Sequence, residues 1–149
     1  MKRLKKCVSF LMALSVVLAL CVSAGATEFA LIKSDSKSAN VGTTATITGE
    51  VWGYTYVYNG IVWMEPTAKT IVNSSKTMAE VTANMECRYD DTGNLVNSNA
   101  TAYNAAYNTN TVAANAAFSV QRTSVRVVIY TAHGATYSRS DVLYMTASA

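Results

Sequence analysis

Residues 88–97, RYDDTGNLVN, hold several potential ligand oxygens in a short space. Asp90, Asp91 and Asn94 surround Gly93 and could together hold a cation. Calcium needs about six to eight oxygen ligands, and the EF-hand loop provides them by alternating its acids and ending on a glutamate. Three side chains fall short of that number. Asp in the first position and Gly in the fourth fit a type I turn in a three-residue hairpin. We therefore predict a turn, with no metal site.

The same residues resemble one unit of the YD repeats of large secreted toxins and wall proteins, which read Y-D-x-x-G-x-L. Tyr89, Asp90, Gly93 and Leu95 match this pattern. The resemblance covers a single unit, whereas YD arrays stack many units. We therefore interpret the match as hairpin chemistry, and predict that Leu95 and Val96 begin the returning strand.

His133 is the single histidine, in the segment TAHGAT. Nucleophilic catalysis through it would need an activated hydroxyl and an orienting acid. Ser138, Ser140 and Asp141 are near in sequence, but the G-x-S-x-G pattern of a nucleophile elbow is absent. One histidine without a cysteine pair also argues against structural zinc. We expect His133 to lie exposed, at a strand end or turn.

Pairs of carboxylates are the remaining catalytic candidates. Glu80 and Glu86 fall on one face of a predicted strand, where six residues span roughly 20 Å, too far for an acid and base to share one bond. The separation of Glu50 and Glu65 depends on the fold and stays open. We expect no enzymatic activity and no cofactor, and a small envelope hydrolase ranks as the third functional hypothesis.

Residues 50–65, EVWGYTYVYNGIVWME, carry the most distinctive pattern. Asn59-Gly60 between two apolar runs predicts a two-residue type I′ hairpin, because both central positions need positive φ. That register pairs Tyr58 with Ile61, Tyr56 with Trp63 and Tyr54 with Glu65. One face then carries the aromatic residues Trp52, Tyr54, Tyr56, Tyr58 and Trp63, together with Ile61. The other carries Val51, Thr55, Val57, Val62 and Met64.

These five aromatic residues are the candidate ligand-binding surface. Tyr and Trp rings can stack on the C–H faces of sugars and are favoured at protein interfaces. The alternative is that they form core or steady the sheet as cross-strand pairs. We favour core, because exposing all of them would leave an apolar patch unusual for a monomer.

The rest of the sequence predicts strands and turns. In TMAEVTANMECRYD, alternation places Ala79, Val81, Ala83, Met85, Cys87 and Tyr89 on one face. Further strands are expected at 41–50, 67–72, 124–132 and 141–148, and a first one in EFALIK. Residues 33–40 read as a polar connection, and residues 97–120 as strand, long loop and strand. The prediction is an all-β fold, an antiparallel β-sandwich of about seven to nine short strands, with a small β-barrel as the alternative.

Residues 1–26 have the pattern of a cleaved secretory signal peptide. Four basic residues precede an uncharged run from Cys7 to Ala24, and Ala24-Gly25-Ala26 is a suitable cleavage site. Residues 27–149 are then predicted to form a single domain. Of 12 Lys and Arg, the leader holds four, leaving eight against nine Asp and Glu. A net charge of −1 gives no electrostatic support for nucleic-acid binding. Cys87 remains alone, which excludes an intrachain disulfide, and its place on the apolar face predicts a buried thiol, with an intermolecular disulfide as the alternative.

The leader resembles those of Gram-positive bacteria. We predict a small secreted, extracellular, monomeric and non-enzymatic protein, either released or loosely associated with the cell wall. It is expected to bind wall glycan or another surface protein, or to have a structural role. After cleavage of the leader no membrane attachment is expected. The alternative is a secreted bacteriocin or toxin-like factor, because the plan of leader, small disulfide-free β domain and aromatic, Asn-rich strands resembles the lactococcin 972 group.

Overall fold

The computed structural model describes residues 29–148, so the predicted leader lies outside the described residues. The described chain forms antiparallel strands joined by turns and contains no helix. The eleven strands are β1 (Ala30–Asn40), β2 (Thr44–Gly53), β3 (Thr55–Tyr58), β4 (Ile61–Met64), β5 (Thr67–Ser74), β6 (Met78–Tyr89), β7 (Thr101–Thr109), β8 (Thr111–Asn115), β9 (Phe118–Val120), β10 (Val127–Thr136) and β11 (Ser140–Ser148).

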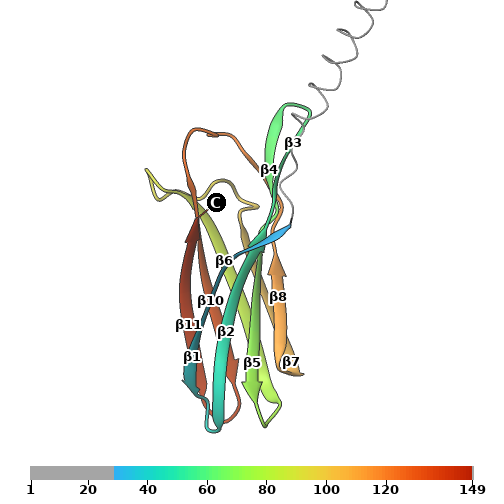
Figure 1. Cartoon of the computed structure of the whole chain (residues 1–149), viewed down its shortest axis with the longest axis vertical. Coiled ribbons are helices and arrows are strands. Elements are labelled where there is room, and N and C mark those ends of the chain that lie inside the picture. The colour runs from blue at the N-terminus through green and yellow to red at the C-terminus, as the bar shows by residue number, and fades with distance from the viewer. Residues whose placement is uncertain (1–28, 149) are drawn as a thin grey trace, which may run out of the picture.

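Two four-stranded sheets, ordered β1-β2-β5-β8 and β11-β10-β6-β7, form the body of the molecule (Figure 1). A third sheet, β3-β4-β9, lies at one end, where the β3–β4 hairpin projects beyond the long strands. The predicted all-β antiparallel sandwich is confirmed, and the described strands do not close into the alternative barrel. Eleven strands replace the predicted seven to nine. Two segments expected to be loops also pair: one lengthens the predicted first strand, and the other contains an additional strand.

The first of these segments is residues 33–40, which lie within β1. β1 pairs with β2 from Ala30↔Gly53 to Asn40↔Thr44. It is the end strand of its sheet and most of its side chains face solvent, so it needs no apolar alternation. The second is the predicted long loop within 97–120, which instead contains β7, β8 and β9, with Asn110 alone between β7 and β8.

The core lies between the two large sheets, where alternate residues of each strand point inwards. On β6 these are Val81, Ala83, Met85, Cys87 and Tyr89, as predicted. Ala79 is the exception: it is exposed, and Met78 takes the buried position at the start of the strand. Neighbouring strands fill the layer with the buried residues Ala45, Ile47, Val51, Ala68, Val72, Ile129, Leu143, Met145 and Ala147. Burial raises the pKa of the Cys87 thiol to about 12, which keeps it protonated.

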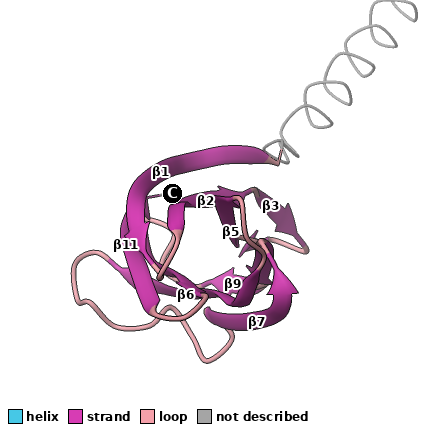
Figure 2. Ribbon diagram, turned by 90° about the horizontal axis from the view of Figure 1, so that it is seen from below, coloured by secondary structure: helices cyan, strands magenta, loops and turns pink. Residues whose placement is uncertain are grey.

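The two open edges of the sandwich are bridged by side chains. β1 runs around one side of the molecule, from beside β2 to beside β11 (Figure 2). Lys33 Nζ donates to the backbone oxygen of Thr146 at 2.8 Å, and Lys37 Nζ pairs with Asp141 Oδ1 at 2.6 Å. At the other edge, Asn104 Nδ2 of β7 donates to the oxygen of Ala113 in β8 at 2.8 Å. These bonds join the edges without a backbone ladder.

His133 is buried in the middle of β10, so its predicted place at an exposed turn is wrong. Nδ1 lies 2.9 Å from Thr70 Oγ1 on the opposite sheet, and Nε2 lies 2.9 Å from Thr131 Oγ1. The Thr70 hydroxyl donates its one hydrogen to the oxygen of Thr82 at 2.8 Å, so it accepts from Nδ1–H. Nε2 then accepts from Thr131. His133 is thus a neutral, fully bonded link between the two sheets, and its burial lowers its pKa to about 4.

Candidate functional site

The β3–β4 hairpin has the predicted turn and register. Asn59 and Gly60 have φ of 51° and 75°, the positive values that a type I′ turn requires. Tyr58 pairs with Ile61 and Tyr56 with Trp63. The N–H of Glu65 donates to the oxygen of Tyr54 at 3.1 Å, which continues the pairing past the last strand residue.

Five rings form a continuous row that we call the aromatic ladder: Phe29, Trp52, Tyr54, Tyr56 and Trp63. Phe29 stacks on Trp52 with ring centroids 5.8 Å apart and meets the edge of Tyr54 at 6.0 Å. Tyr54 stacks on Tyr56 at 5.6 Å, and Tyr56 on Trp63 at 6.5 Å. Four of the five residues predicted from the sequence are therefore brought together, along the line that leads from β2 into the hairpin.

The ladder lies at the surface rather than in the core that we favoured, and Tyr56 and Trp63 form a cross-strand pair of the kind considered together with core. Its four predicted members are half-buried, and Tyr58 at the hairpin tip is 63% exposed and lies outside the stack. Trp52 is on the outward side of β2, and the hairpin projects beyond the two large sheets, so that one of its faces alone meets the body of the protein. That face contributes Met64, which is buried, and Val62, which packs against the core.

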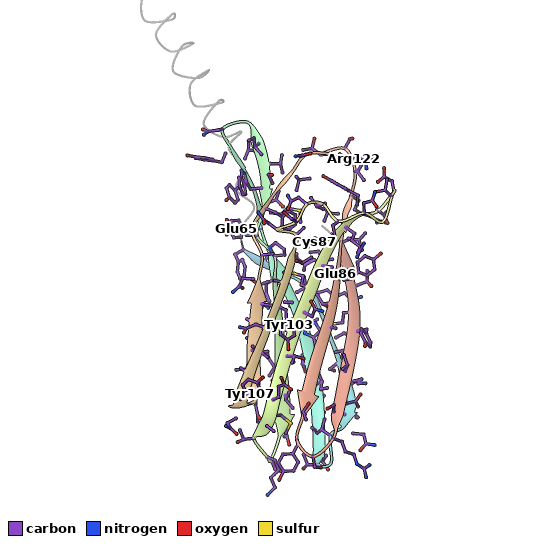
Figure 3. All side chains as sticks on the ribbon, turned by 180° about the vertical axis from the view of Figure 1, so that it is seen from behind. Glu65, Glu86, Cys87, Tyr103, Tyr107 and Arg122 are labelled. Carbon is purple, nitrogen blue, oxygen red and sulfur yellow. The ribbon has the colours of Figure 1, made fainter. Side chains whose placement is uncertain are left out.

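Two carboxylates hold the ladder in place. The hydroxyls of Tyr54 and Tyr56 donate to Glu65 Oε2 and Oε1 at 2.5 and 2.8 Å (Figure 3 labels Glu65 at the base of the hairpin). This hydrogen bonding to Glu65 raises the pKa of both tyrosines. Trp52 Nε1 donates to Glu50 Oε2 at 2.8 Å, and Lys69 Nζ lies 3.7 Å from the same oxygen. Glu50 and Glu65 therefore serve different rings.

A surface depression of about 260 Å³ lies at the β2 end of the ladder, lined by Phe29, Trp52, Thr67 and Lys69. Two aromatic residues form its apolar wall, and Thr67 and Lys69 complete the lining. The sequence did not predict that Phe29 belongs to the ladder, because no local sequence pattern links Phe29 to Trp52. The β1–β2 pairing brings them together, since Leu31 is the register partner of Trp52.

A second aromatic surface was not predicted. The outward side of the β11-β10-β6-β7 sheet carries four exposed tyrosines, which we call the tyrosine face: Tyr103, Tyr107, Tyr130 and Tyr144. Their exposed fractions are 65%, 68%, 46% and 76%. Figure 3 shows Tyr103 and Tyr107 one after the other along β7, with Glu86 of β6 beyond Tyr103. The sequence signal that could have found this pair is the echo AYNAAYN, because residues four apart on a strand share a face.

The Asp90-Asp91-Thr92-Gly93 segment is a turn, but it is one residue longer than the predicted three-residue hairpin loop, because Tyr89 rather than Asp90 closes it and the N–H of Tyr89 donates to the oxygen of Asn94 at 2.9 Å. Gly93 has φ of 68°, and its N–H donates to the oxygen of Tyr89 at 2.8 Å. The acids pair with arginines of the loop before β10: Asp90 with Arg126 and Asp91 with Arg122, both at 2.5 Å. Hydrogen bonding to Arg122 lowers the pKa of Asp91.

The returning strand expected after this turn is absent from its predicted place. Leu95 forms only an isolated bridge with Arg88, and Val96 donates one backbone bond to Cys87. Regular pairing with β6 resumes at Thr101 in β7. Between these points the backbone forms local hydrogen bonds. For example, the N–H of Asn99 donates to the side-chain oxygen of Asn97 at 2.9 Å.

The carboxylates of β6 have separate partners. Glu86 Oε2 accepts from Arg88 at 2.7 Å, and the negative charge of Glu80 raises the pKa of Tyr107.

Across residues 29–148, no group of three or more His, Cys, Asp and Glu side chains is arranged to hold a metal ion. Within the same residues, no helix is long and apolar enough to cross a membrane. Comparisons with protein-family models, with curated proteins and with solved structures found no match to this chain.

Proposed function

We propose that the protein is a small secreted, non-enzymatic module that binds polysaccharide of the bacterial cell wall through the aromatic ladder. The observation that supports this proposal is a row of stacked rings at the surface that ends in a depression walled by Phe29 and Trp52. Aromatic rings offer a large contact area with few rotatable bonds, and they stack well on the apolar faces of sugar rings.

The ladder is fixed before any ligand arrives. Glu50 and Glu65 hold Trp52, Tyr54 and Tyr56 through side-chain hydrogen bonds, so binding loses little rotamer freedom in those rings. Stacking covers part of each inner ring, whereas Phe29 at the end of the row is 52% exposed. The end of the ladder at the depression is therefore where a sugar has both an open ring and polar partners, Thr67 and Lys69.

Phe29→Ala should weaken binding to isolated cell wall by about tenfold, because one ring contact of roughly 1.4 kcal/mol is lost. Binding is measured by sedimentation of purified protein with insoluble wall material. Phe29 precedes β1 and is half exposed, so the substitution leaves the core intact.

Tyr137→Ala is the matched control. Tyr137 is 41% exposed, lies in the turn between β10 and β11 and belongs to neither aromatic surface. It should bind like the unmodified protein. Equal affinity of Phe29→Ala and the control, with both folded by circular dichroism, would remove the depression from the binding site.

One observation favours a second candidate function, a secreted toxin-like factor acting on neighbouring cells. The tip of the projecting hairpin exposes Val57, Tyr58 and Ile61, at 55%, 63% and 48%. Apolar side chains at the tip of a projecting element can enter a lipid interface. On this hypothesis purified protein inhibits growth of related bacteria, and Val57→Ser with Ile61→Ser abolishes the inhibition. Normal growth with the unmodified protein at every concentration tested would reject it.

A further inference from the structure

The tyrosine face is organised by strand register into a flat, continuous surface. Tyr144 of β11, Ala132 of β10, Asn84 of β6 and Tyr103 of β7 are successive partners in one row. Three strand spacings separate the outer two, about 14 Å at roughly 4.8 Å each. Tyr103 and Tyr107 are four residues apart on one strand, about 13 Å. Each of these distances exceeds the width of one sugar ring, so a ligand that touches several tyrosines must be a chain.

The tyrosines of this face differ from those of the ladder in having open rings. Every contact between two aromatic rings within residues 29–148 belongs to the ladder, so these four rings stack on no other ring. Between them, Ala132 leaves a depression of about 180 Å³ bordered by Tyr130, Tyr144, Asn84 and Glu86. The site thus combines open aromatic faces with amide and carboxylate groups that bond hydroxyls.

The charge of the face restricts its partner. Its outward charged side chains on β6 are Glu80, Glu86 and Arg88, and Arg88 pairs with Glu86 at 2.7 Å, so the net charge is −1. A polyanion would be repelled. A second copy of the chain would place the same negative groups opposite each other in a two-fold contact and would desolvate Asn84. A neutral polymer rich in hydroxyl donors has neither cost, because its hydroxyls can donate to the carboxylates.

We infer that the tyrosine face is a second binding surface, for a neutral polysaccharide chain. It lies on the outward side of one large sheet, whereas Trp52 and its depression lie on the outward side of the other. One molecule therefore holds two polymer chains and cross-links them. The tyrosine face binds whether or not the ladder does, but cross-linking rests on the function proposed for the ladder.

The experiment uses affinity electrophoresis in native gels that contain a soluble neutral β-glucan or, as the anionic comparison, polygalacturonate. The neutral polymer should retard the protein, and the anionic polymer should not. In a Phe29→Ala background, which lacks the end ring of the ladder, Tyr103→Ser with Tyr144→Ser should weaken the remaining binding by about tenfold in the retardation series, since two exposed rings are lost. Tyr137→Ser is the control and should behave as the unmodified protein.

Cross-linking is measured in the same mixtures by the rise in light scattering. The unmodified protein should cross-link the β-glucan, and Phe29→Ala and Tyr103→Ser/Tyr144→Ser should each retain one binding surface and cross-link poorly. Wild-type retardation and scattering of the tyrosine variant would overturn the second surface while leaving the ladder in place. If retardation and scattering fall in the tyrosine variant but not in Phe29→Ala, this inference is supported and the ladder is rejected as a binding surface. No retardation by the neutral polymer, or a dimer in sedimentation that the tyrosine substitutions dissociate, would overturn the inference.

Discussion

Gly49→Ala should destabilise the protein by about 3 kcal/mol, the upper end of the usual cost of overpacking a core. Gly49 is buried in β2, opposite the inward side of β10. A Cβ at this position would lie 2.5 Å from His133 Cδ2 and 2.5 Å from Met145 Sδ. His133 cannot move aside without losing its bonds to Thr70 and Thr131. The measurement is the free energy of unfolding in urea.

A double-mutant cycle tests the cause of that loss. In a His133→Ala background the space beside residue 49 is open on the ring side, so adding Gly49→Ala should cost much less than it does alone. Thr46→Ala, on the outward side of the same strand, is the control for a β2 substitution and should change the free energy of unfolding little. Additive effects in the cycle would show that the close approach to His133 is not the cause.

Stability should fall by about 3 kcal/mol as the pH is lowered from 6.5 to 4, and His133 should account for the fall. In the folded protein the pKa of His133 is lowered from 6.5 to about 4 by burial. Across this interval the unfolded chain therefore binds a proton that the folded chain does not, and each pH unit costs about 1.4 kcal/mol. The free energy of unfolding is therefore highest above pH 6.5, and the loss due to His133 is complete below pH 4. Urea unfolding at a series of pH values measures it.

His133→Asn provides the comparison, because an amide can bond to a neighbouring threonine but does not titrate in this range. The variant starts from a lower stability, and its free energy of unfolding should be nearly constant from pH 6.5 to 4. Asp141 changes the free energy of unfolding in a separate pH interval. Hydrogen bonding to Lys37 lowers its pKa to about 2, so its contribution is lost as the pH falls from 3.8 to 2. An equal slope in both proteins between pH 6.5 and 4 would assign the effect to other groups.

Local signals in the sequence predicted local structure well. Asn59-Gly60 determined the register of the hairpin, and the alternation from Val81 to Tyr89 identified the buried side of β6. Each feature depends on residues adjacent in the chain. The first strand was predicted only up to Lys33, and residues 33–40 of β1 were missed because an edge strand exposed to solvent has the polar composition of a loop.

The candidate sites depended on contacts between distant residues. His133 owes its burial to Thr70, which is 63 positions away. Phe29 reaches Trp52 only through the pairing of β1 with β2. The tyrosine face is assembled from β7, β10 and β11, and only its β7 pair leaves a trace in the sequence. Alternation identifies the two sides of a strand, but it does not say whether another layer covers a given side. The ladder is exposed because no further layer of the described residues covers its side of β2 and of the hairpin.

The side-chain bridges between β1 and β11 have a consequence for behaviour at high concentration. Unpaired strand edges are where other chains add to a sheet, and such addition can continue into fibrils. Here the free edges of β1 and β11 face each other, and Lys33, Lys37 and Asp141 occupy the space between them. An incoming strand would have to displace the hydrogen bond of Lys33 and the Lys37–Asp141 ion pair before it could pair. The arrangement protects the protein from fibril growth along its longest edge.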